Sequence, residues 1–426
     1  MRLVNGSQVM IVGGGPAGSF AALHLLRFAA QAGLRLEITI FEARDFNRPG
    51  LGGCNKCAGI LSSTLVRNMA AIGLELPTEV IQAELEAYVL HLNGTELLVD
   101  RPDLARRIVS AYRGSGPRLG EAPYPHSFDS WLLEQAQSRG SSLRRERVQS
   151  IQAGPRPRVV TAHQDYEADL VIVATGINTR TPLEPAWNYR PPRTEIMAQD
   201  EIFLPGGMSG RQVHIFFEPP AGLLFGGIIP KGRYANLSLL GHDLPKDAIT
   251  LFLAGHQVPA LLPQGAPALL CGCKPLVGVS PAVGYYADRM VAVGDAAVSR
   301  LYKDGLGSAF ETSEAAARTA VERGIGRGDF AAGYHPTCLR IAVDNLYGRL
   351  IFRLWSATRR STRLVNAWQD AVLRESALPV SKQIHRRALW GIFSGDESYR
   401  QIFWLLISKA GLGALLSSAL RRGRRI

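Results

Sequence analysis

Residues 8–18 of the chain read QVMIVGGGPAG, a β-branched apolar run that passes directly into a glycine-rich turn. The run over residues 9–12 is typical of a buried parallel strand. An apolar helical pattern follows over residues 19–30, and residues 37–42 read as a second strand that ends in Glu42. A strand, a G-x-G-x-x-G turn, a helix and a strand with a terminal acid together predict a dinucleotide-binding unit.

Each part of this unit has a predicted task. Gly13 permits the tight turn, Gly15 lets the backbone approach a pyrophosphate, and Gly18 lets the helix pack closely on the strand. The helix N-terminus, which includes Ala17, presents free N–H groups and a partial positive charge to the phosphates. We expect Glu42 to accept hydrogen bonds from ribose hydroxyls. The alternative is a glycine-rich turn in an unrelated α/β unit, which the flanking strands and the terminal acid disfavour.

Two later segments predict further contacts with the same ligand. Residues 169–173 form another apolar strand, which runs into a small-residue turn ending at Gly176. The strand over residues 289–293 is followed by Gly294 and Asp295, and then by a helical pattern over residues 310–323. An aspartate in this position can bind polyol hydroxyls, although a plain strand-to-helix turn remains the alternative.

In this order and at these separations, the three segments resemble flavoproteins of the para-hydroxybenzoate hydroxylase fold. Within that fold the chain most resembles the geranylgeranyl reductase family. Four short segments carry the closer resemblance: KCAGIL (56–61), FDSWL (128–132), IPK (229–231) and KDGLGSA (303–309). Pro125 stands where that family has an arginine, while Phe225 and Gly227 stand where it has a tyrosine and a tryptophan.

The resemblance implies an α/β protein with a Rossmann-like FAD-binding domain, an antiparallel β-sheet substrate domain and a helical, basic C-terminal region. We predict that the FAD-binding domain comprises residues 1–190 and 275–330, the substrate domain 191–274 and the helical region 331–426. A single FAD then serves both half-reactions. No second G-x-G-x-x-G preceded by a strand occurs in the sequence.

The resemblance also implies which residues contact FAD. Its adenosine end is expected at the first turn, its ribityl chain near Asp295, and its ring by Gly305 and Gly307, whose backbone N–H groups stabilise the negative charge of reduced flavin. An ordinary helix-entry loop is the alternative for those two glycines. The expected cofactor-binding residues are Gly13, Gly15, Ala17, Gly18, Glu42, Ala43, Cys57, Ala58, Gly176, Gly294, Asp295, Gly305, Gly307 and Ser308.

The substrate is expected to contact the very apolar stretch 222–229 and the residues next to it. The expected substrate-binding residues are Phe225, Gly227, Ile229 and Pro230. An apolar wall with gaps suits a greasy, elongated ligand, although a core strand has the same composition. Gly227, in place of a tryptophan, enlarges the expected cavity.

The cysteines give one candidate catalytic residue. Cys54 and Cys57 form a C-x-x-C pair, but Cys271 and Cys273 make a poor second pair for zinc, so no metal site is expected. The resemblance implies that Cys57 lines the pocket beside the flavin, while a buried structural thiol is the alternative. Four histidines are expected to lie apart, without pairing: His126, His163, His214 and His242.

The net charge of +12 predicts an anionic partner. Residues 386–426 hold eight Lys or Arg and only two acids, among apolar and aromatic helical segments. This pattern favours adsorption to an anionic membrane surface over nucleic acid, for which no reading motif is present. The alternative is a helical cap with a solvated basic tail. Neither an export signal nor a transmembrane helix is expected, so we predict a cytoplasmic protein that is peripheral on the membrane.

The resemblance favours an enzyme that reduces carbon–carbon double bonds of an isoprenoid-like lipid. NAD(P)H or a reduced electron carrier is the expected donor. Two alternatives stay open: a flavin-dependent monooxygenase of the same fold acting on an apolar or aromatic substrate, and a non-catalytic, membrane-associated protein that binds flavin or lipid. A halogenase is disfavoured because no Trp-x-Trp-x-Ile-Pro segment occurs.

Overall fold

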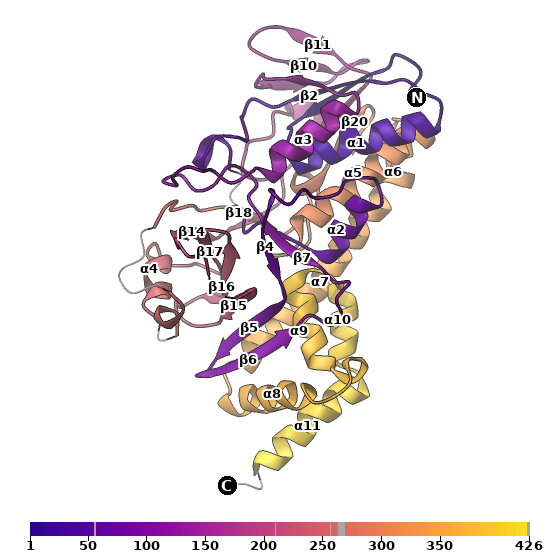
Figure 1. The fold of residues 1–426 in the computed structure, drawn as a ribbon. Helices are drawn as coiled ribbons and strands as arrows, with labels where there is room; N and C mark the ends of the chain where they lie inside the picture. The colour runs from indigo at the N-terminus through magenta and orange to yellow at the C-terminus, as the bar shows by residue number, and fades with distance from the viewer. Residues whose placement is uncertain (55–56, 209, 256, 263–268, 424–426) are drawn as a thin grey trace.

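The computed structural model describes residues 1–54, 57–208, 210–255, 257–262 and 269–423. Figure 1 shows an elongated molecule in three tiers. An α/β unit lies at the top, a second sheet lies in the middle on the left, and the C-terminal helices lie at the bottom. The prediction of a mixed α/β fold is therefore confirmed.

The upper sheet contains the strand that the glycine-rich turn follows. Its order is β19-β20-β12-β1-β2-β8, with every pair parallel except β19–β20. The central strands are fully buried because helices and loops cover both faces, which explains their continuous apolar sequence. The strands are β1 (Gln8–Val12), β2 (Glu37–Phe41), β8 (Ser142–Arg144), β12 (Leu170–Val173), β19 (Tyr286–Ala287) and β20 (Met290–Ala292).

Two long helices, α1 (Pro16–Gln31) and α5 (Gly305–Glu322), pack against each other beside this sheet. The rings of Phe20 and Phe310 meet edge to face with centroids 5.1 Å apart. Helix α5 begins five residues before the start of the helical pattern that we expected at Phe310. It does so because the Asp304 side chain caps its first turn.

The second large sheet has the order β14-β17-β16-β15-β5-β6 and is antiparallel except for the pair β15–β5. Four strands come from the predicted substrate domain, but β5 and β6 come from the range that we assigned to the FAD-binding domain. They form a hairpin through Asn93 and Gly94, both with positive φ. The strands are β5 (Ala87–Leu92), β6 (Thr95–Asp100), β14 (Ala198–Phe203), β15 (Gln212–Phe216), β16 (Leu223–Lys231) and β17 (Tyr234–Gly241).

The remaining strands form three small sheets, with the orders β3-β7-β4, β11-β10-β9 and β13-β18. Their strands are β3 (Ile60–Leu61), β4 (Ile81–Leu85), β7 (Ile108–Ala111), β9 (Ser150–Gln152), β10 (Arg158–Val160), β11 (Asp165–Glu167), β13 (Thr194–Ile196) and β18 (Leu276–Gly278). The remaining helices of this part are α2 (Ser63–Ala70), α3 (Phe128–Ser138) and α4 (Ala248–Leu253).

The C-terminal part is helical. Its helices are α6 (Arg327–Gly333), α7 (His335–Thr358), α8 (Thr362–Glu375), α9 (Ile384–Ser394), α10 (Tyr399–Leu406) and α11 (Lys409–Gly423). They pack on the second sheet: Tyr88 Oη of β5 donates to the Phe393 carbonyl at 2.9 Å, and Gln369 Nε2 donates to the Leu92 carbonyl at 2.7 Å. In the described ranges no single helix is long and apolar enough to cross a membrane, although α10 and residues 409–418, bent by 54°, meet that criterion together.

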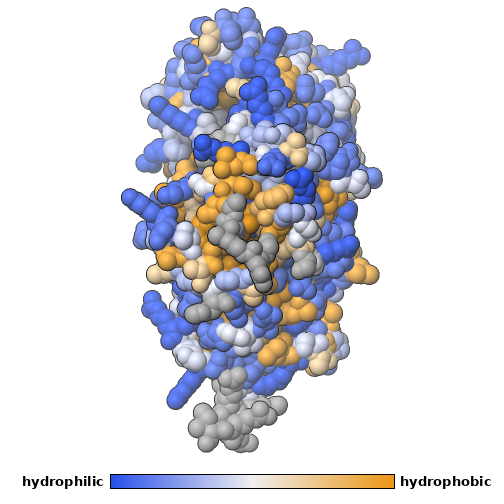
Figure 2. Space-filling model, turned by 60° about the vertical axis from the view of Figure 1, so that its left-hand side comes forward, coloured by the Kyte–Doolittle hydropathy of each residue, from blue (hydrophilic) through white to orange (hydrophobic). Residues whose placement is uncertain are grey.

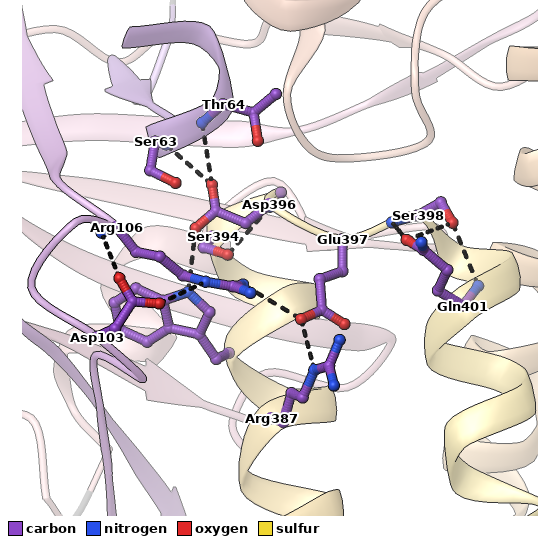
Figure 3. A network of polar contacts seen from close by, with 12 residues as sticks. Ser63, Thr64, Asp103, Arg106, Arg387, Ser394, Asp396, Glu397, Ser398 and Gln401 are labelled. Carbon is purple, nitrogen blue, oxygen red and sulfur yellow. Dashed lines mark hydrogen bonds and ion pairs between the residues drawn. The ribbon is translucent and has the colours of Figure 1, made fainter. Parts of the chain in front are cut away.

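A polar cluster at the turn between α9 and α10 fixes these helices to the rest of the molecule (Figure 3). Asp396 Oδ1 accepts from the Ser63 N–H at 2.9 Å, at the start of α2. Glu397 Oε1 accepts from Arg106 at 3.2 Å and from Arg387 at 2.7 Å. The cluster therefore holds the carboxyl end of α9, including Phe393, in a fixed position beside the second sheet.

The side of the molecule that carries the second sheet and α4 also exposes apolar residues. Figure 2 shows hydrophobic residues gathered in the middle of this side, between hydrophilic surfaces above and below. Leu251 on α4 and Leu269 are exposed leucines of this part of the chain. Exposed apolar surface is therefore not confined to the C-terminal helices.

Candidate active site

A cavity of about 1040 Å³ lies where the carboxyl ends of β1, β2 and β12 face the second sheet and the start of α5. This volume is at the upper end of the range for ligand pockets, about 300–1000 Å³, so the cavity has room for a large ligand. We call it the main cavity. The predicted site residues that line it are Gly13, Gly15, Ala17, Glu42, Ala43, Cys57, Ala58, Gly176, Phe225, Gly227, Ile229, Asp295 and Gly305.

The first turn approaches the sheet so closely that side chains are excluded. Gly13 has φ +109°, and a Cβ atom there would lie 2.4 Å from the Ala174 carbonyl oxygen. Glu42 stabilises the turn, because its Oε2 accepts from the Gly14 N–H at 3.0 Å and its Oε1 accepts from the Arg44 N–H at 2.9 Å. The carboxylate keeps further acceptor capacity toward the cavity.

Five predicted site residues lie outside the lining: Gly18, Pro230, Gly294, Gly307 and Ser308. Two of them act through packing. A Cβ atom on Gly18 would lie 1.8 Å from the Gly13 carbonyl oxygen, and one on Gly294 would lie 2.7 Å from Ala17 Cβ. These two glycines therefore let α1 and the turn before α5 approach the cavity.

Ser308 and Pro230 hold neighbouring backbone in place. Ser308 Oγ accepts from the Arg300 N–H at 2.9 Å, and the Pro230 carbonyl accepts from Ser110 Oγ at 2.6 Å. Neither contact faces the main cavity. The direct cofactor contact expected of Ser308 and the substrate contact expected of Pro230 stay predictions.

The start of α5 faces the cavity with two free donors. Asp304 Oδ1 accepts from the Gly307 N–H and from Ser62 Oγ, each at 3.1 Å, so the Gly307 donor is already used. Burial raises the pKa of Asp304 to about 7. In the described chain the N–H groups of Gly305 and Leu306 have no acceptor, and both residues line the cavity. They can bind an anionic or carbonyl edge of a ligand.

Cys57 lies in the wall of the main cavity, as does Cys54. The Gly59 N–H donates to Cys57 Sγ at 3.3 Å, and Cys57 is not part of a disulfide. Lys56, which belongs to the segment that resembles the reductase family, lies outside the described residues. Among the residues that are described, no three His, Cys, Asp or Glu side chains gather in a way that could hold a metal ion.

An arginine that the sequence did not single out completes this wall. Arg113 Nε and one terminal nitrogen each lie 3.0 Å from an oxygen of Asp129, which has no exposed surface. Pro125 stands where the resemblance expects an arginine, and Arg113 lies twelve residues earlier in the chain. Arg113 also lowers the pKa of Asp295, although burial of that carboxyl raises it more.

A second group, also unpredicted, lies beneath Cys57. The Lys231 side chain is only 1% exposed, and its Nζ lies 3.3 Å from Glu201 Oε1 and 3.3 Å from the Cys57 carbonyl. Tyr112 Oη donates to Glu201 Oε2 at 2.7 Å, and the ammonium lies 4.4 Å from the centre of the Tyr112 ring. This buried lysine therefore has a complete set of partners, and it fixes the backbone of Cys57.

One expectation about the histidines is wrong. His214 is paired: its Nδ1 lies 2.9 Å from Nε2 of His91, and the two rings stack. The parallel pairing of β15 with β5 brings these residues together, and it joins strands that are far apart in the sequence. Burial lowers the pKa of each histidine to about 4, so both are neutral near pH 7.

A smaller cavity of about 360 Å³ lies between the second sheet and the C-terminal helices, and we call it the apolar cavity. Phe225 lines both cavities. Leu354, Ile407 and Leu412 line the apolar cavity and are also exposed, which marks its mouth. Its other lining residues are Phe217, Ile351, Phe352, Trp355, Thr358, Trp368, His385, Ala388, Leu389, Ile392, Phe393, Phe403, Leu406 and Leu415.

Together, the two sheets and the glycine cradle define the fold of FAD-dependent oxidoreductases, and solved structures of this fold superpose on 83% to 99% of this chain. A geranylgeranyl bacteriochlorophyll reductase-like protein from Thermoplasma acidophilum is 15% identical, with a TM-score of 0.63 over 98% of this chain and 96% of that one. A flavin-dependent brominase is 14% identical, with a TM-score of 0.57 over 99% and 100%. A 2-methyl-3-hydroxypyridine-5-carboxylic acid oxygenase is 15% identical, with a TM-score of 0.57 over 83% and 92%. Neither a family model nor a curated protein matches the sequence.

The predicted fold is confirmed by these superpositions, and the residues present fit FAD. The Gly13 turn leaves room for a pyrophosphate, and Glu42 keeps acceptor capacity for a ribose. Asp295 lies in the cavity wall, and the Gly305 and Leu306 donors face the cavity beyond it. FAD needs each of these features in this order along an extended cavity.

Proposed function

We propose that the chain is an FAD-dependent oxidoreductase that reduces carbon–carbon double bonds of an isoprenoid-like lipid. The observation that carries this proposal is the apolar cavity, which adjoins the main cavity through Phe225. Its lining is almost entirely aliphatic and aromatic, with Thr358 and His385 as the exceptions. Burial of apolar surface is the principal means by which such a cavity binds a ligand, so it suits a long hydrocarbon chain.

In this proposal, different residues of the main cavity bind different parts of FAD. The Gly13 turn and the start of α1 hold the pyrophosphate, Glu42 holds the adenosine ribose, and Asp295 holds the ribityl chain. The N–H groups of Gly305 and Leu306 bind the edge of the ring that becomes negatively charged. Bound FAD, once reduced by NAD(P)H or a reduced carrier, would supply the hydride for one carbon of the double bond, and a proton would be added to the other carbon.

The remaining residues position the lipid and exclude water. Phe225, Gly227 and Ile229 form the part of β16 that lines the main cavity. Cys57 lies in the same cavity, over the buried Lys231, and is our candidate for a side chain that touches the reacting carbons. The protein contributes to hydride transfer by holding the lipid and the cofactor in a fixed geometry and by excluding water from the site.

We also propose that the C-terminal helices adsorb to an anionic membrane surface, from which the lipid enters. Trp404 on α10 is 55% exposed, close in sequence to the exposed Ile407 and Leu412 at the mouth of the apolar cavity. The helix α7 exposes a regular stripe of five aliphatic residues: Leu339, Val343, Leu346, Leu350 and Leu354. Exposed apolar side chains beside a basic segment favour an anionic bilayer as partner.

Reoxidation of the reduced flavin tests the proposed reaction. Holoenzyme reduced with dithionite is mixed anaerobically with a geranylgeranyl lipid or with its fully saturated counterpart, and the flavin absorbance is followed. We expect reoxidation with the unsaturated lipid only. A monooxygenase is the second candidate, favoured by the oxygenase among the similar folds. Reoxidation by oxygen alone, together with none by the unsaturated lipid, would support it and overturn the reductase.

A further inference from the structure

Lys303 is a half-buried cation of the main cavity, and no counter-ion lies beside it among the described residues. Its side chain lines the main cavity, just before the start of α5. Within the described ranges its Nζ has neither a hydrogen-bond acceptor nor a carboxylate partner. Its contacts are with two aromatic rings, the centre of Phe225 at 5.3 Å and that of Phe393 at 6.0 Å.

The neighbouring charged groups do not supply the missing anion. The Asp304 carboxylate accepts from Ser62 and from the start of α5, and Arg300 adds a second positive charge. The Cys57 thiol is the other titratable group that acts on Lys303. Burial, together with Arg300, lowers the pKa of Lys303 to about 8, and the Cys57 group opposes this shift. The lysine therefore remains mostly protonated at neutral pH.

The contacts of Lys231 differ from those of Lys303. Lys231 is fully buried outside the lining of the main cavity and is paired with Glu201, the Cys57 carbonyl and the Tyr112 ring. Lys303 instead presents its ammonium to the main cavity without a counter-ion among the described residues. An ammonium placed in this way can pair with a negative charge that the ligand brings.

The position of Lys303 indicates which part of the ligand brings that charge. Phe225 lines both cavities and Phe393 lines the apolar cavity, so the ammonium lies at the boundary between them. A chain that occupies the apolar cavity places its polar end at this boundary. At this boundary the Lys303 ammonium can pair with one negatively charged group.

We propose that Lys303 binds a carboxylate group on the ligand, so that the substrate is an apolar, isoprenoid-like chain that carries one carboxylic acid. This inference rests on the proposed function for the chain in the apolar cavity, but it concerns binding and needs no turnover. The ammonium donates a hydrogen bond to one carboxylate oxygen. The Phe225 and Phe393 rings beside the ammonium hold it in place.

Binding of two matched lipids to the oxidised holoenzyme tests the inference. Geranylgeranoic acid and geranylgeraniol share one chain and differ in the charge of one end. Quenching of Trp355 and Trp368 fluorescence in the apolar cavity, with calorimetry, reports their dissociation constants. We expect the wild type to bind the acid roughly 30-fold or more tightly than the alcohol. This preference should fall as the pH rises through about 8, because the ammonium loses its proton.

The substitution Lys303→Met should abolish the preference, because it weakens binding of the acid far more than binding of the alcohol, whereas Lys303→Arg should keep it. The exposed Lys246, replaced by methionine, serves as the control. Equal binding of acid and alcohol by the wild type, a preserved preference in Lys303→Met, or tighter binding of geranylgeranyl phosphate would overturn the inference. A protein that binds the acid as expected but reduces no double bond keeps this inference and overturns the proposed reaction, so the two failures are distinguishable.

Discussion

Arg113 and Asp129 form a two-bond ion pair in the wall of the main cavity, with both nitrogen–oxygen distances at 3.0 Å. Asp129 lies in the first turn of α3 and has no exposed surface. The pair joins the loop after β7 to the helix that covers the upper sheet. Such a bidentate geometry fixes both partners at once.

Replacing Arg113 with methionine should strongly destabilise the protein. The substitution removes the cation of this ion pair from the buried Asp129 carboxylate, and breaking a buried pair in this way costs about 3–5 kcal/mol. Urea denaturation of the apoprotein measures the change. The exposed pair Arg158–Asp165, at 3.6 Å, provides the control, since Arg158→Met should cost less than about 1 kcal/mol. Equal losses for the two variants would contradict the importance of the buried pair.

Gly227 is expected to set the size of the substrate site. A Cβ atom there would make only ordinary contacts, with Ile215 Cδ1 nearest at 3.6 Å, so Gly227→Ala should be tolerated. Gly227→Trp should fill this part of the main cavity and reduce lipid turnover by about tenfold or more, the equivalent of 1.4 kcal/mol. FAD content and turnover are measured for both variants. Full activity of the tryptophan variant on the long lipid would show that the substrate lies elsewhere.

The paired histidines predict how stability depends on pH. Burial lowers the pKa of His91 and of His214 to about 4, below the unfolded value of 6.5. The unfolded chain therefore binds more protons between these values, and stability is lost as the pH falls from 6.5 toward 4. The slope is at most about 1.4 kcal/mol per pH unit for each group.

Denaturation at a series of pH values checks this dependence. The double variant His91→Gln, His214→Gln should show a shallower slope than the wild type over the same range. His24, whose pKa burial lowers to about 3, contributes to the slope of both proteins. Identical slopes in wild type and double variant would mean that the pair does not titrate as its burial implies.

Vesicle sedimentation measures the predicted membrane contact. The protein should sediment with vesicles that contain phosphatidylglycerol and much less with pure phosphatidylcholine, and salt should weaken this binding. Trp404→Ser combined with Leu412→Ser should reduce it several-fold, because both side chains are exposed at the mouth of the apolar cavity or next to it. Leu104→Ser removes an exposed leucine outside the C-terminal helices and is the control. An equal loss in that control would contradict the assigned surface.

The parts of the site that depend on local sequence were predictable. The strand, the Gly13 turn and the acid at Glu42 lie within 35 consecutive residues, and their spacing alone indicates a dinucleotide site. The Gly-Asp turn before α5 was predicted for the same reason. Local geometry fixes these contacts, so the residue types are constrained at known positions.

The parts that depend on long-range pairing were not predictable. The hairpin of β5 and β6 carries an Asn-Gly turn signal, but nothing in the local sequence shows that β5 pairs with β15. His91 of β5 and His214 of β15 are 123 residues apart in the sequence. Arg113 was missed because its partner Asp129 lies 16 residues further along the chain, so no local pattern indicates the pair. Lys303 has no counter-ion among the described residues, and the absence of a counter-ion leaves no pattern in the sequence.

Mass spectrometry of the lipid product tests the central claim most directly. Reduced holoenzyme is incubated with a geranylgeranyl lipid in the absence of oxygen, and a parallel sample is run in air with an electron donor. We predict a gain of two hydrogens for each reduced double bond, without oxygen, in the anaerobic sample. An unchanged lipid there, together with a gain of one oxygen atom in air, would contradict the reductase and identify a monooxygenase.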